Sequence, residues 1–138
     1  MSHEKLITFT DGGSRGNPGP SASGIVVKSG EMTIVAFGEY LGKTTNNIAE
    51  YTAVVRALET ARDLGAKEVD CYMDSELIVK QMKGIYRVKN AGLAPLYLRI
   101  RNLMQSFRTV HFHHVPRERN KEADTQVNIA IDRALGKS

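Results

Sequence analysis

The fold of this chain is decided by residues 9–20, which are Phe9-Thr10-Asp11-Gly12-Gly13-Ser14-Arg15-Gly16-Asn17-Pro18-Gly19-Pro20. The residues that lead into this stretch, 6–10, are mostly β-branched or aromatic, and this composition predicts a strand. We expect the strand to end at Asp11, because five of the eight residues from 13 to 20 are glycine or proline. A carboxylate at a strand end beside such a loop can face a ligand that the backbone approaches closely.

Working outward, the next segments predict an antiparallel meander followed by a parallel crossover. Strands are expected at residues 24–28 and 33–40, with Ser29-Gly30 as the turn between them. Apolar residues then recur at helical spacing over 47–64, and Gly65 supplies the stop. A strand over 68–74 follows. This strand–helix–strand order allows the strand at 68–74 to lie parallel to the first strand, joined by a right-handed crossover.

The second half of the chain predicts three helices and one more strand. Residues 76–82 have helical spacing, and 85–96 are irregular. Pro95 is expected to open a helix, because proline suits a first helical turn. A strand is expected at 110–115. Asn120 is expected to cap the final helix.

Four acidic residues lie at the boundaries of these elements. Asp11 and Asp74 are placed at the carboxyl ends of two parallel strands, an edge where open α/β sheets bind ligands. Glu50 begins the apolar stripe of its helix, although it could instead form a capping box with Asn47. Asp74 could likewise be a helix N-cap. Asp124 is expected at the edge of a buried stripe, where a carboxylate is costly unless it is paired or metal-bound.

Together these four carboxylates predict a site for divalent metal. Oxygen ligands without histidine or cysteine suit Mg²⁺ or Mn²⁺. Like charges brought this close cannot all remain ionised cheaply without a cation. Two such ions, about 3.5–4 Å apart, are a known device for in-line displacement at phosphorus.

Composition limits the alternatives. The 138 residues predict one domain over 1–138, and 19 basic against 15 acidic residues leave a mild positive charge compatible with a polyanionic partner. The single cysteine, Cys71, excludes an internal disulfide and disfavours a cysteine zinc site. His111 and His113 share a strand face, but no aspartate or glutamate is expected nearby, so a histidine metal site is disfavoured. Without a leader-like or membrane-spanning segment, a cytoplasmic protein is expected.

Four motifs follow one another along the chain: Thr10-Asp11-Gly12 through Asn17-Pro18-Gly19-Pro20, Thr44-Thr45-Asn46-Asn47-x-x-Glu50, Asp74-Ser75 and Asn120-x-x-x-Asp124. In this order and spacing the sequence resembles the type 1 ribonucleases H over nearly its whole length. The resemblance implies an α/β fold with a five-stranded mixed sheet of order 3-2-1-4-5 and helices on both faces. It also implies endonucleolytic cleavage of the RNA strand of RNA–DNA hybrids, leaving 5′-phosphate and 3′-hydroxyl ends.

The same resemblance assigns roles to individual residues. By motif match, the catalytic metal ligands are Asp11, Glu50, Asp74 and Asp124, which would hold two Mg²⁺ ions with substrate, Mn²⁺ being able to substitute. One ion should activate the attacking water, and the other should stabilise the leaving 3′-oxygen. The residues expected to contact the hybrid are Gly12, Ser14, Asn17, Thr45, Asn46, Asn47 and Glu76. The asparagines could instead serve only in turns and caps.

Several positions depart from the family pattern. Many relatives carry a histidine in a longer loop before the last carboxylate, and here Arg117 is the candidate replacement. Residues 84–93 stand where larger relatives insert a basic protrusion. Glu76 replaces a glutamine that often touches substrate, and Gln126 replaces an apolar residue. The resemblance implies a monomer whose partner is the hybrid, with no membrane and no obligate protein partner. The alternative is a hybrid-binding protein of the same fold that cuts poorly.

Overall fold

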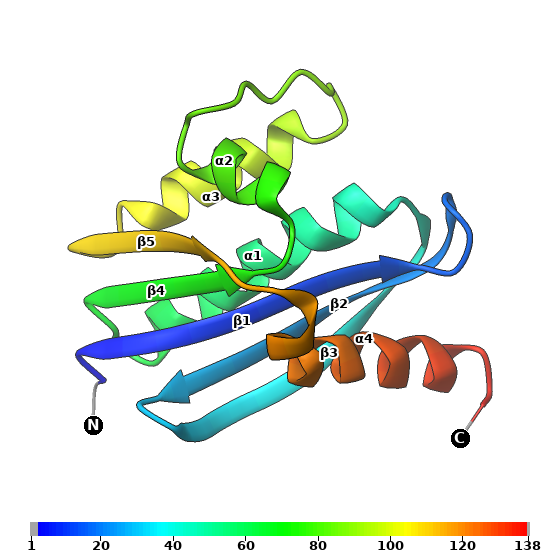
Figure 1. Ribbon diagram of the computed structural model, residues 1–138, viewed down its shortest axis with the longest axis horizontal. Helices are drawn as coiled ribbons and strands as arrows, with labels where there is room; N and C mark the ends of the chain where they lie inside the picture. Colours follow the sequence, from blue (N-terminus) through cyan, green and yellow to red (C-terminus); the bar gives the residue numbers. More distant parts are fainter. Residues whose placement is uncertain (1–2, 138) are drawn as a thin grey trace.

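The computed structural model describes residues 3–137, which form a single mixed β-sheet with helices on both faces (Figure 1). In chain order the elements are β1 (Lys5–Ser14), β2 (Gly19–Ser29), β3 (Met32–Thr44), α1 (Asn46–Asp63), β4 (Glu68–Met73), α2 (Glu76–Met82), α3 (Ala94–Met104), β5 (Thr109–His114), the short 3-10 helix η1 (Arg117–Arg119) and α4 (Lys121–Ala134).

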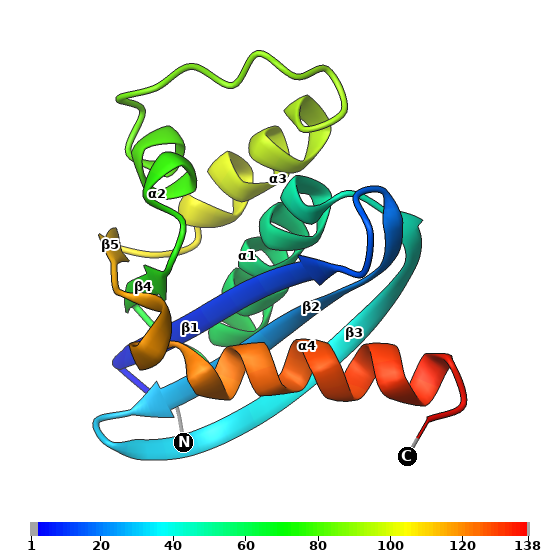
Figure 2. The same ribbon diagram turned by 45° about the vertical axis from the view of Figure 1, so that its right-hand side comes forward.

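The sheet has the strand order β3-β2-β1-β4-β5, as predicted. The first three strands pair antiparallel, and β1–β4 and β4–β5 pair parallel. α1 packs on β1 and β2 from one face, while α4 crosses β1, β2 and β3 on the opposite face (Figure 2). Among the described elements, no helix lies over the outer part of the sheet, β4 and β5, on the α4 side (Figure 1).

Alternation along the strands decides which side chains reach each face. In β1, Leu6, Thr8 and Thr10 are buried, whereas Ile7 and Phe9 between them are only half-buried. Of this buried set, Leu6 belongs to the main hydrophobic core, which lies between the sheet and α1, α2 and α3. Asp11 therefore shares its face with Phe9, on the side of the sheet that α4 covers in part.

Two glycines allow the helices to lie directly against the strands. A Cβ at Gly12 would stand 2.2 Å from the backbone nitrogen of Glu50, and one at Gly24 would stand 2.1 Å from the carbonyl oxygen of Ala123. No side chain fits at such distances, so glycine lets backbone approach backbone at both positions. The first turns of α1 and α4 are thereby fixed on the two faces of the sheet.

The first strand is longer than the sequence pattern predicted. β1 continues to Ser14, because Gly12–Ser14 pair with Ser21–Ser23 of β2. Its parallel pairing with β4, however, ends at Thr10 opposite Met73. Asp11 thus lies at the end of the parallel ladder but within β1, and the expectation of a strand end at this residue was wrong.

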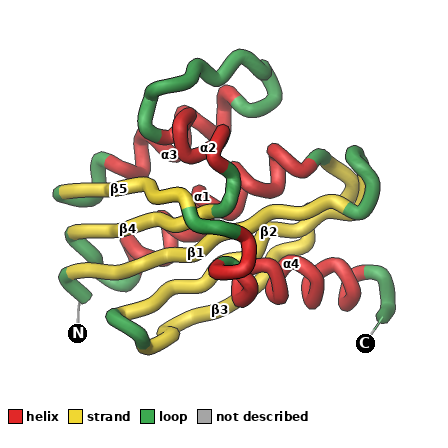
Figure 3. The backbone as a smooth tube through the Cα atoms, viewed as in Figure 1, coloured by secondary structure: helices red, strands yellow, loops and turns green. Residues whose placement is uncertain are grey.

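The connection between α2 and α3, residues 83–93, contains neither helix nor strand, which agrees with the irregular stretch predicted from residue 85 onward. It is a long loop that stands away from the sheet (Figure 3). Cys71 is a buried free thiol within the core. Within residues 3–137, no helix has both the length and the apolar character needed to cross a bilayer.

The Gly24 contact gives a first testable prediction. Gly24→Ala should lower the free energy of unfolding by about 1–3 kcal/mol, because the new methyl group would meet the backbone of α4 rather than a movable side chain. Gly13→Ala is the matched control, since its Cβ would meet only the Val127 side chain, at 3.0 Å. Urea unfolding should show a clearly larger loss for Gly24→Ala. Equal loss in the two variants would contradict the proposed backbone contact.

Candidate active site

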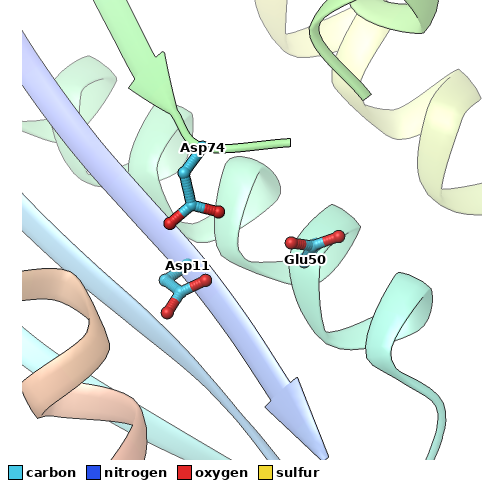
Figure 4. Close-up of side chains that lie close together, drawn as sticks. All are labelled: Asp11, Glu50 and Asp74. Carbon is cyan, nitrogen blue, oxygen red and sulfur yellow. The ribbon is translucent and has the colours of Figure 1, made fainter. Parts of the chain in front are cut away.

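Three carboxylates from three separate elements meet at the end of the parallel ladder. Asp11 lies in β1, Glu50 lies near the start of α1, and Asp74 directly follows β4. One oxygen from each lies within 4.8 Å of the others. Figure 4 shows the carboxylates of Asp11 and Asp74 side by side, with Glu50 across from them on the helix. All three residues are half-buried.

Backbone contacts hold these side chains together. Thr10 pairs with Met73, so the residues that follow them, Asp11 and Asp74, are neighbours on adjacent strands. The Gly12 contact brings the start of α1 onto β1, and the hydroxyl of Ser23 donates to the Ala49 carbonyl at 2.6 Å. Glu50 is therefore held beside the strand carboxylates by the packing of the main chain.

Other residues cap the two helices, which leaves the acidic side chains free. The backbone N–H of Ile48 donates to the Thr45 hydroxyl at 3.3 Å, so Thr45 is the N-cap of α1. Ser75 caps α2 in the same way. The alternative roles, a capping box between Asn47 and Glu50 and an N-cap at Asp74, are therefore excluded.

The electrostatics of the cluster favour the uptake of positive charge. Burial raises the pKa of Asp11 from 3.8 to about 8, and smaller contributions come from the Asp74 charge, a hydrogen bond with Asp124 and the charges of Glu50 and Asp124. Burial and then the Asp74 charge raise the pKa of Glu50 from 4.5 to about 7, against the opposing effect of Arg117. At neutral pH these carboxyls retain protons in part unless a cation replaces them.

Asp124 stands apart from this group of three. It lies in the first turn of α4 and is exposed, so the expectation that burial would demand a partner for it was wrong. Its side chain nevertheless reaches Asp11 closely enough to share a hydrogen bond. Asn128 donates to the Asp124 backbone carbonyl at 3.1 Å. Asp124 thus faces the cluster from the solvent side.

Asn120 has a role that the sequence pattern did not reveal. It occupies the N-cap position of α4 but makes no capping hydrogen bond with its side chain. Its Nδ2 atom instead donates to the Thr10 carbonyl at 2.8 Å and to Asp74 Oδ2 at 3.0 Å, and the residue is only 1% exposed. Asn120 therefore ties the Asp74 carboxylate to β1 and to the start of α4. Its place in the Asn120-x-x-x-Asp124 motif was the one available signal.

The loop before α4 and the loop after β1 form the surroundings of the cluster. Arg117 is exposed in η1, close enough to Glu50 for its charge to lower the pKa of that carboxyl. Asn17 Oδ1 accepts a hydrogen bond from the backbone N–H of Asn46 at 3.2 Å. The Ser14 hydroxyl donates to the Thr44 carbonyl at 3.2 Å. The structure thus brings together, at the start of α1, the candidate substrate residues Gly12, Ser14, Asn17, Thr45, Asn46 and Asn47.

Two other predicted groups lie outside the cluster. Glu76 is exposed on α2, where its carboxylate pairs with Lys80 at 3.1 Å, one helical turn away. His113 does have an acidic neighbour, contrary to expectation, since its Nε2 lies 3.0 Å from Asp70 Oδ1. Within the described residues, however, only the carboxylates of Asp11, Glu50 and Asp74 form a three-ligand group.

Comparisons with known proteins agree with this geometry. Residues 9–130 match a family model described as reverse transcriptase-like. A ribonuclease H of Paracidovorax citrulli is 32% identical over 151 residues, covering 97% of this chain and 99% of that protein. Ribonuclease HI of Halobacterium salinarum is 42% identical over 131 residues, covering 94% of this chain and 66% of its own length.

A solved structure extends the comparison to three dimensions. LC11-RNase H1, determined in complex with an RNA/DNA hybrid, superposes with a TM-score of 0.89 at 45% identity and covers 94% of this chain and 99% of that chain. The chain spans only about a third (36%) of the longer mycobacterial relatives that it also matches, at 42% identity. Family match, full-length relatives and fold together show that this chain belongs to the type 1 branch of the ribonuclease H family.

Proposed function

We propose that this protein is a metal-dependent endonuclease that hydrolyses the RNA strand of RNA–DNA hybrids, leaving 5′-phosphate and 3′-hydroxyl ends. The observation that carries the proposal is the convergence of Asp11, Glu50 and Asp74, with an oxygen of each within 4.8 Å of the others. The ribonuclease H relatives and the hybrid-bound LC11-RNase H1 support it.

The residues present fit divalent metal ions. The cluster offers only carboxylate oxygens, the ligands that Mg²⁺ and Mn²⁺ prefer, and its raised pKa values show that the site stabilises added positive charge. Asp11, Glu50 and Asp74 would hold two Mg²⁺ ions together with substrate, and Asp124 would complete the set from the solvent side. When bound, the ions would supply positive charge at the scissile phosphate and make an attacking water more acidic.

The surrounding residues would position the substrate. At Gly12 the main chain of β1 lies directly beside Glu50. The Gly12 main chain and the Glu50 carboxylate would contact a 2′-hydroxyl of the substrate, the group that distinguishes RNA from DNA. The positive end of the α1 dipole favours a phosphate nearby, and Asn17 is tied to this end through the backbone N–H of Asn46. Arg117 would place a cation beside Glu50 when negative charge develops on the phosphate.

The proposed activity makes a direct prediction about substrate choice. End-labelled RNA–DNA hybrid should be cut in its RNA strand with Mg²⁺ or Mn²⁺, whereas single-stranded RNA and duplex DNA should stay intact. Chelator should abolish cutting, because the carboxylates alone supply no positive charge at the phosphate. Equal cutting of duplex DNA, or activity in excess chelator, would overturn the proposal. Tight hybrid binding without cutting would instead favour a binding protein of the same fold.

Asp74→Asn should abolish cleavage and yet stabilise the metal-free protein. Folding raises the pKa values of Asp11 and Glu50, so the metal-free protein loses stability as pH rises from about 4, where the unfolded carboxyls ionise, to about 8. The charge of Asp74 contributes to both shifts, and its removal should recover about 1–2 kcal/mol at neutral pH. The asparagine oxygen can still accept the hydrogen bond from Asn120.

Thermal melts in chelator would measure this gain as a rise of a few degrees at pH 7 that fades in acid. Saturating Mg²⁺ should shrink or reverse it, because metal stabilises the wild type by mass action. Asp63→Asn is the control, since the Asp63 side chain is 71% exposed and pairs only with Arg62. A lower melting temperature for Asp74→Asn than for wild type in chelator at pH 7 would contradict the clustered-carboxylate account.

Asn120→Ala should weaken Mg²⁺ binding and cleavage by about 10–100-fold, the usual effect of removing a group that orients a metal ligand. Without Asn120, Asp74 loses the donor that holds its carboxylate in place. Calorimetric titration with Mg²⁺ provides a readout separate from activity. Asn102→Ala is the control, because Asn102 is exposed on α3, which carries none of the proposed metal ligands. Unchanged Mg²⁺ affinity in a folded Asn120→Ala variant would rule out the positioning role.

A further inference from the structure

The outer edge of β5 is open along its length. Within residues 3–137, β5 pairs only with β4 and is the last strand of the sheet (Figure 1). The backbone N–H groups of Thr109 and Val115 donate to Lys67 and Met73, so alternate residues of β5 turn their hydrogen-bonding groups toward β4. The residues between them, Val110 and Phe112, must therefore turn theirs outward. The outward N–H and carbonyl groups of such an edge can pair with a strand from another chain.

A hollow of about 310 Å³ runs along this open edge and is here called the β5-edge groove. Its lining residues come from the end of α2, from α3 and from the strand itself: Met82, Lys83, Arg101, Met104, Val110, His111, Phe112 and His113. The two methionines and Val110 provide apolar surface. No acidic residue is among those that line it.

The two cations of the groove, Arg101 and Lys83, have no acidic partner among the described residues. Arg101 Nε donates to the Tyr97 hydroxyl at 3.0 Å, and its guanidinium lies 4.9 Å from the centre of the Tyr97 ring. Lys83 is exposed at the end of α2. Throughout the described part of the chain, neither forms a salt bridge with a carboxylate. The groove is therefore complementary to an acidic ligand.

An aromatic row on the open face of the sheet ends at the same edge. The rings of Phe9 and Tyr72 stack at 5.2 Å, and those of Tyr72 and His113 stack at 4.7 Å, across directly paired positions of β1, β4 and β5. His113 is fixed by its contact with Asp70 at 3.0 Å. A strand added beside β5 could continue this row with one more aromatic ring opposite His113.

From these three features, we propose that the β5-edge groove binds an extended acidic segment of another protein by strand addition. On one side of the added strand, acidic and apolar side chains would face Lys83, Arg101 and the methionines. On the other side, an aromatic side chain would stack on His113. This binding goes beyond the proposed nuclease activity and involves none of the carboxylates of the candidate active site.

Two other occupants fit the groove less well. A nucleic acid backbone presents acceptors to a strand edge that alternates N–H donors with carbonyl acceptors, so half of the edge would repel it. A second copy of this chain would bring its own Lys83 and Arg101 against the same cations. An acidic peptide can pair with the alternating N–H and carbonyl groups of the edge, and its charge is opposite to that of Lys83 and Arg101.

The test uses the full chain labelled with ¹⁵N and the synthetic peptide acetyl-Glu-Thr-Val-Tyr-Glu-Thr-amide. Saturable chemical-shift changes should concentrate on Lys83 and on residues 110–113. Lys83→Glu should weaken peptide binding at least tenfold while hybrid cleavage stays unchanged. Lys137→Glu is the control: Lys137 follows α4 and does not line the groove, so peptide binding should be unchanged. Two peptides N-methylated on alternate residues should differ: the one methylated on edge-facing amides should lose binding, and the other should retain it.

The proposal is overturned if no saturable change occurs at millimolar peptide, if the changes map elsewhere, or if both N-methylated peptides bind alike. If a short oligothymidylate changes the chemical shifts of the same residues and binds with higher affinity than the peptide, the groove is a nucleic-acid surface instead. Because the peptide test reads binding at β5 and the hybrid assay reads cleavage at Asp11, Glu50 and Asp74, failure of one leaves the other standing.

Discussion

The close packing of α1 against β1 at Gly12 is the contact on which the candidate active site depends. A Cβ at Gly12 would collide with the Glu50 backbone, so only glycine lets the helix reach the strand at this point. The end of the β1–β4 ladder then places Asp11 beside Asp74. Three carboxylates are thus brought together by the main chain, and their own repulsion opposes the arrangement.

That repulsion connects stability to function. Burial and neighbouring charge hold the pKa values of Asp11 and Glu50 at about 8 and about 7, so the metal-free fold carries an electrostatic cost at neutral pH. A bound cation would offset the cost, so the site favours positive charge before any substrate arrives. Asn120 serves the same arrangement by holding Asp74 to the Thr10 carbonyl. The metal site therefore depends on carboxylates that repel one another and that backbone packing holds together.

The sequence correctly predicted those features that depend on residues close together in the chain. The alternation of Val69, Cys71 and Met73 placed Asp74 correctly, and Gly65 marked the end of α1. The errors came from long-range contacts. β1 runs past Asp11 because β2 pairs with it, and Asn120 leaves its capping role for an oxygen 110 residues away in the chain. The burial expected for Asp124 failed because α4 buries Ala123, Val127 and Ile131 and leaves the neighbouring Asp124 exposed, a boundary that helical spacing alone does not fix.

The central claim is that folding forces these carboxylates together against their charge. A ¹³C NMR titration of the side-chain carboxyls in the metal-free protein tests it most directly. The account predicts pKa values of about 8 for Asp11 and about 7 for Glu50, with both falling sharply on addition of Mg²⁺. Ordinary values near 4 for both groups, unchanged by Mg²⁺, would contradict it.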